Sequence, residues 1–97
     1  MMITREYHPV ASVPHALPVT VTVAVNFVQF DSRNPDMSMR ASFDQVRIES
    51  SIFAGQPVLK VTGEASKDQW WQVTLNIEDG SELAGLIAQA RTVEHNL

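Results

Sequence analysis

The sequence predicts an α+β domain: a four-stranded antiparallel β-meander with one C-terminal α-helix packed on one face. Three observations predict this fold class. Valine occupies every second position of residues 19–25, which is the period of a strand with one apolar face. Turn-forming residues at 54–55 and 66–68 separate later alternating segments. From residue 83 onward the apolar residues follow the spacing of an amphipathic helix.

The length of 97 residues fits a single domain, 1–97. We expect residues 1–18, which contain three prolines, to form an irregular lead-in. The sheet should occupy residues 19–77 and the helix residues 80–94, with Asp79 as N-cap and Glu82 in the capping-box position. The four predicted strands are 19–30, 39–50, 58–65 and 69–77. The predicted apolar stripe of the helix is Leu83, Leu86, Ile87, Ala90 and Val93.

The two later turns set the register of the last three strands. A two-residue turn at 54–55 places Ile48 opposite Val61, and a three-residue turn at 66–68 then places Gly63 opposite Trp71. A glycine opposite a large ring leaves room for that ring to lie across its strand. Because a slip of one residue would turn a whole strand over, this agreement supports the meander.

Near the tip of the first predicted hairpin, the apolar side chains fall on the face opposite the helix. Pairing Phe30 with Met39 brings Val21 opposite Ile48 and leaves residues 26–43 projecting as a two-stranded arm. An exposed apolar cluster of this kind usually marks an interaction surface. The predicted interaction surface consists of Val28, Phe30, Met39, Ala41, Phe43 and Trp70.

Two other arrangements would bury this arm. The lead-in could fold over it through Val10, Val13 and Leu17, and the same segment could cover Trp70. Alternatively, a β-bulge near Phe27 or Asp44 would return the arm's side chains to the core.

Composition narrows the function classes. The net charge is −4 and the seven basic residues are scattered, which argues against a nucleic-acid partner. The absence of cysteine excludes disulfides and thiolate metal sites and is compatible with a cytoplasmic location. No apolar run reaches the about 18 residues of a membrane span, and residues 1–7 lack the pattern of a secretory signal.

The expected function is a non-catalytic protein-interaction module that uses the outer sheet face and the arm, first of all to form a homodimer and otherwise to bind another protein. No catalytic, nucleotide-binding or cofactor-binding motif indicates an enzyme. The histidines at 8, 15 and 95 lack metal-ligand spacing. We therefore predict no metal, no cofactor and no catalytic residue.

Two alternatives stay open from the sequence alone. One is a small-molecule-binding protein with a pocket between helix and sheet, where Gly63 and Gly85 could leave room. The other is an enzyme with its site at a dimer interface, built from Asp44, His15 or Arg47.

Overall fold

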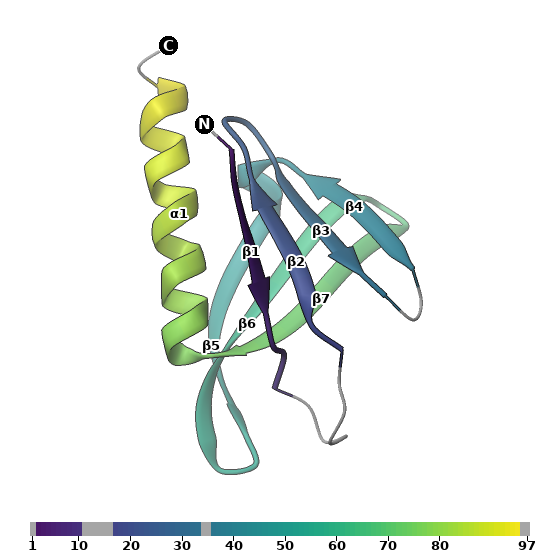
Figure 1. Cartoon of the computed structure of the whole chain (residues 1–97), viewed down its shortest axis with the longest axis vertical. Coiled ribbons are helices and arrows are strands. Elements are labelled where there is room, and N and C mark those ends of the chain that lie inside the picture. Colours follow the sequence, from purple (N-terminus) through teal and green to yellow (C-terminus); the bar gives the residue numbers. More distant parts are fainter. Residues whose placement is uncertain (1, 11–16, 34–35, 96–97) are drawn as a thin grey trace.

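A computed structural model describes residues 2–10, 17–33 and 36–95, with side chains to residue 93. Its strands form two antiparallel sheets rather than one (Figure 1). Sheet A consists of β1 (Ile3–Tyr7), β2 (Val19–Val23), β3 (Val28–Ser32) and β4 (Met37–Ala41), in that spatial order. Sheet B consists of β5 (Val46–Phe53), β6 (Gln56–Ser66) and β7 (Gln69–Asn76), followed by the helix α1 (Ile77–His95).

The core lies between the two sheets and α1. Phe30 of β3 and Trp71 of β7 stack with ring centroids 4.7 Å apart and planes 6° apart, so they join the two sheets directly. The helix, which runs along one side of the molecule next to β1 (Figure 1), adds Leu83, Ile87 and Ala90 to this core. The α+β class is therefore confirmed, but the single four-stranded sheet is wrong. No helix within the described residues is long and apolar enough to cross a membrane.

The predicted strand over residues 19–30 is two strands. A tight turn separates β2 from β3, and the backbone N–H of Ala24 donates to the carbonyl of Phe27 at 2.9 Å. Val23 before the turn and Val28 after it are both fully buried although they are an odd number of residues apart. The turn therefore shifts the alternation by one residue, which sends the later apolar side chains into the core.

The predicted strand over residues 39–50 is also interrupted. A short 3₁₀ turn, η1 (Phe43–Gln45), separates β4 from β5 and carries the chain from sheet A to sheet B. Val21 consequently lies opposite Phe30 and not opposite Ile48. The remaining predicted pairs are confirmed: Phe30 with Met39, Ile48 with Val61, and Gly63 with Trp71.

Three smaller expectations are corrected. The start of the lead-in is not irregular, because Ile3–Tyr7 pairs with β2 along its whole length. The turn after β6 is tighter than predicted, since Ser66 pairs with Gln69 and an irregularity between Glu64 and Ser66 restores the register. Residues 11–16, which include Val13 and His15, lie outside the described residues.

The helix begins directly after β7, three residues earlier than predicted. The side-chain Oδ1 of Asn76 accepts a hydrogen bond from the backbone N–H of Asp79 at 2.7 Å, so Asn76 and not Asp79 caps the first turn. Gly80 lies against β6, where an added Cβ would come within 2.6 Å of Leu59. Glycine at this position lets the helix approach the sheet closely.

Candidate functional site

The six residues of the predicted interaction surface do not form one exposed surface in the structure. Four of its six residues are buried, with at most 5% of each residue exposed: Val28, Phe30, Ala41 and Phe43. Met39 is half-buried and packs against the core. The expected projecting arm is wrong, because residues 28–32 and 37–41 are β3 and β4 of sheet A, which faces sheet B. The chain irregularities near Phe27 and Asp44, considered above as a β-bulge, take the form of a turn and of η1.

Trp70 is the one predicted surface residue that is broadly exposed, at 58%. It lies on the outer face of sheet B, because its neighbour Trp71 points into the core. A hollow of about 430 Å³ lies beside it. The hollow is lined by Arg47, Thr62, Glu64, Ser66, Lys67 and Trp70, and we call this set the Trp70 surface.

The Trp70 surface combines one aromatic ring with charges of both signs. Glu64 is the cross-strand neighbour of Trp70, and its Oε1 accepts a hydrogen bond from Nη2 of Arg47 at 3.1 Å. This ion pair is more than half exposed on both sides, so its net contribution to stability is small. Both side chains can exchange this contact for one with a ligand at little cost. Lys67 adds a second positive charge on the adjacent turn.

A second feature is the outer edge of β5. In the described part of the chain, no strand pairs with this edge. On the inner side of the edge lies an apolar groove of about 230 Å³ between β5 and α1. Its lining residues are Phe43, Val46, Ile48, Ala84, Ile87, Ala88 and Arg91.

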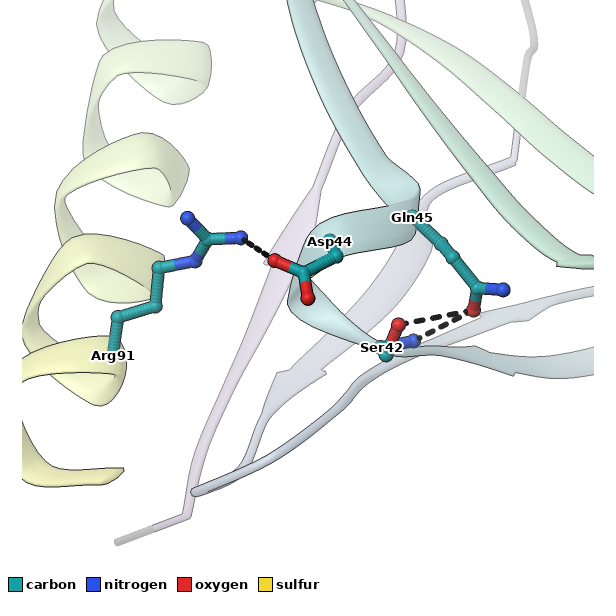
Figure 2. Close-up of polar contacts among 4 residues, drawn as sticks. All are labelled: Ser42, Asp44, Gln45 and Arg91. Atoms are coloured by element: carbon teal, nitrogen blue, oxygen red, sulfur yellow. Dashed lines mark hydrogen bonds and ion pairs between the residues drawn. The ribbon is translucent and has the colours of Figure 1, made fainter. Parts of the chain in front are cut away.

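Polar contacts hold the start of β5 in position beside the helix (Figure 2). Nη2 of Arg91 on α1 donates to the carboxylate of Asp44 in η1 at 2.9 Å. Within the corner, the backbone N–H and the hydroxyl of Ser42 lie 3.2 and 3.1 Å from Oε1 of Gln45. These contacts join α1 to the corner where the chain enters β5, and because Asp44 is 95% exposed the net contribution of its ion pair to stability is small.

The groove between β5 and α1 is a pocket between helix and sheet, but it does not lie at Gly63 or Gly85. The space beside Gly63 is filled by the Trp71 ring, and Gly85 faces open space on the helix. The Asp44 side chain is 95% exposed and pairs with Arg91, so it is no buried base. His15 lies outside the described residues, and no group of three His, Cys, Asp or Glu within them could hold a metal ion.

The phenol of Tyr7 has a pKa that is shifted from its ordinary value. Burial, then a hydrogen bond from its hydroxyl to Oε1 of Glu82 at 2.9 Å, raise the pKa of this phenol well above its usual range. Arg5 lies 3.6 Å from the same carboxylate. A phenol that stays protonated at neutral pH acts here as a hydrogen-bond donor that ties β1 to α1.

A larger hollow, of about 560 Å³, lies over the outer face of sheet A and is lined mainly by polar side chains such as Glu6, Thr20 and Asp31. It has no aromatic side chain among its lining residues.

Comparisons of the chain with protein-family models, with curated proteins and with solved structures gave no match.

Proposed function

We propose that the chain is a non-catalytic protein-interaction module that binds a partner protein through the Trp70 surface. The observation that carries this proposal is the 58% exposure of Trp70 inside a ring of polar and charged side chains. A large aromatic residue surrounded by a polar rim is the usual arrangement of an interface hot spot. Its burial by a partner would remove a large apolar area from water.

The charges around Trp70 favour a protein over a nucleic acid. Arg47 and Lys67 stand beside Glu64, and the whole chain carries a net charge of −4. A nucleic-acid surface draws most of its affinity from phosphate neutralisation and would need a clear basic excess. A protein partner can match both signs, with acidic groups opposite Lys67 and a donor opposite Glu64.

The proposal is tested by replacing Trp70 with a photo-crosslinking phenylalanine analogue in the source organism. Mass spectrometry of the crosslinked adduct identifies the partner, and the purified pair is then measured by titration calorimetry. We expect Trp70→Ala to weaken binding by about 30-fold or more, the scale of a hot-spot residue, whereas Trp70→Phe retains part of the affinity.

Ile52→Ala is the matched control, because Ile52 is 76% exposed but lies near the tip of the β5–β6 hairpin, outside the Trp70 surface. It should leave the affinity unchanged. Equal losses in Ile52→Ala and Trp70→Ala would contradict the proposal, as would a purified partner whose affinity ignores Trp70→Ala. If the Trp70 surface retained a glycan and no protein, the proposal of a protein partner would be wrong and Trp70 would instead stack on a sugar.

A further inference from the structure

We propose that two copies of the chain associate by antiparallel pairing of their β5 edges, centred on Ile48. The two sheets B then form one continuous six-stranded sheet. This inference rests on the backbone and charges of β5, and it does not depend on the Trp70 surface having a partner.

The turn at 54–55 determines which backbone groups of β5 are free. Both of its residues have positive φ, 50° and 79°, which is typical of a two-residue hairpin turn. In such a hairpin the flanking residues, Phe53 and Gln56, exchange both backbone hydrogen bonds, and the following pairs alternate between bonded and non-bonded. Pro57, which has no N–H, therefore falls in a non-bonded pair with Ile52.

The same alternation gives the free groups of the whole strand. The backbone N–H and C=O groups that point away from β6 belong to Val46, Ile48, Ser50 and Ile52. Another strand can bond to this row without disturbing β6. Two of the other edges are less open: the N–H of Val10 donates to the carbonyl of Thr74 on β7 at 2.8 Å, and β4 lies close to β6 and β7.

Charge complementarity selects a second copy as the occupant and sets the register. With Ile48 opposite the partner's Ile48, Arg47 lies opposite the partner's Glu49, and the same contact repeats across the two-fold axis. Arg47 and Glu49 are both exposed on the outer face of the sheet, and in the dimer Arg47 exchanges its weak, exposed ion pair with Glu64 for one with the partner's Glu49. The neighbouring symmetric registers place Glu49 against its own copy or Arg47 against its own copy, and like charges directly opposite each other are destabilising.

The groove between β5 and α1 provides the apolar part of the contact. Ile48 is half-buried and lines this groove, while the helix side is built partly from the small residues Ala84 and Ala88. In the proposed register the partner's Ile48 lies next to Ile48 on the same face, because paired residues of antiparallel strands share a face. The two isoleucines cover each other and close the groove to water.

The first test uses charge exchange and analytical ultracentrifugation over about 10–500 µM, the range of a small interface. We expect the unmodified chain to dimerise. Glu49→Arg should weaken the dimer by roughly 10- to 100-fold, because both opposite-charge pairs become like-charge pairs. The double variant Arg47→Glu with Glu49→Arg restores opposite charges, and its dissociation constant should return to within about threefold of the original.

Asp36→Arg is the control for net charge, since it makes the same change at an exposed position in the loop before β4. It should leave dimerisation unchanged. Because Glu49→Arg also places a positive charge opposite Lys60 of β6, circular dichroism checks that this variant is folded. A chain that stays monomeric at every concentration overturns the proposal, as does a dimer that responds equally to Glu49→Arg and Asp36→Arg. Trp70→Ala leaves this dimer intact if the proposal is right, so failure here and failure of the Trp70 proposal are distinguishable.

The second test reads the register directly. The chain has no cysteine, so a single introduced cysteine can bond only to its copy. In the proposed pairing the Cα atoms of the two residues 48 lie about 5.5 Å apart, which is within disulfide range. Ile48→Cys should therefore give a covalent dimer on mild oxidation.

Ser50→Cys is the control for this crosslink. The two residues 50 would be separated by about four residues of strand, or roughly 13 Å, which is too far for a disulfide. Efficient crosslinking through position 50 but not position 48 would exclude the register. Circular dichroism of the reduced variants checks that each one is folded before oxidation.

Discussion

The two faces of sheet B differ most clearly at its adjacent tryptophans. Trp71 is 1% exposed and stacks on Phe30, whereas Trp70 is 58% exposed beside a polar hollow. The two residues belong to the same strand and differ in the direction of their side chains. The comparison shows that the role of each ring depends on what covers its face: sheet A and α1 cover the inner face, while the outer face at Trp70 stays open.

The largest effect is expected from removing the inner ring. Trp71→Ala should lower the free energy of unfolding by about 3–5 kcal/mol, because it deletes the stack on Phe30 and leaves a cavity. Trp71→Phe should cost much less, since it keeps a ring and removes an indole Nε1 that has no hydrogen-bond partner among the described residues. Urea unfolding followed by far-UV circular dichroism measures both. Equal losses for the two variants would mean that ring packing is not the source of the stability.

Gly63 tests how tightly the inner ring is held. An added Cβ would collide with the indole ring of Trp71, so Gly63→Ala should cost about 1–3 kcal/mol through overpacking. Gly85→Ala is the matched control, because Gly85 lies in α1 and faces open space. That substitution should stabilise the protein by about 0.5–1 kcal/mol through helix propensity. The same sign for both variants in denaturant unfolding would contradict this account of Gly63.

Tyr7 tests whether the core also shields a polar side chain from water. Because its pKa is raised in the folded state, the unfolded chain loses the phenol proton first as pH rises. The stabilisation is therefore fully present below about pH 10, the ordinary tyrosine pKa, and is lost progressively above it. Tyr7→Phe should remove this loss and cost about 1 kcal/mol at neutral pH.

Tyr7 is the single tyrosine of the chain, so absorbance at the tyrosinate band follows its ionisation alone. We expect no tyrosinate in the folded protein at the pH where a free tyrosine is half ionised. A midpoint near the ordinary value would show that Tyr7 is exposed to water and that its bond to Glu82 does not persist in solution.

The smallest effect is expected at the outer ring. Trp70→Ala should change the free energy of unfolding by no more than about 0.5 kcal/mol, as for other surface substitutions. In the unmodified chain, acrylamide should quench the Trp70 fluorescence and spare that of Trp71, so Trp70→Phe leaves an emission that resists quenching. A large stability loss in Trp70→Ala would indicate that other parts of the chain cover the outer face.

Sheet B was predictable because turn-forming residues indicate both of its turns and because a glycine, Gly63, lies opposite the large ring of Trp71. The turn at 54–55 and the turn after Ser66 fixed two registers, and Gly63 opposite Trp71 agreed with both. Local turn chemistry and cross-strand packing therefore gave the same answer in this part of the chain.

Sheet A is not predicted because the turn between β2 and β3 carries only one turn-forming residue, Asn26. The sequence from Ala24 to Phe27 contains no glycine or proline, so the alternating valines were extended through it as one strand. The available signal is the change in parity, since the buried valines of β2 are odd-numbered up to Val23 whereas Val28 and Phe30 of β3 are even-numbered. That inversion was interpreted as an exposed outer cluster, whereas tertiary packing against sheet B buries it.

The candidate site was predictable only in part, because the register of sheet B was predicted and the division into two sheets was not. Trp70 lies on the confirmed outer face, so its exposure followed from the register of β7. The free edge of β5 could not be foreseen, because the predicted meander placed another strand along it. Once η1 turns the chain into a second sheet, no strand within the described residues pairs with that edge.

The direct passage from β7 into α1 sets a strict limit on the length of this segment. Asn76 ends the strand and Ile77 begins the helix, with no connecting residue between them. One inserted residue would rotate everything after it by about 100° around the helix axis. Leu83 and Ile87 would then swing toward solvent while Glu82 turned inward. An added residue is therefore expected to cost more stability at this junction than at the exposed hairpin tip, residues 54–55.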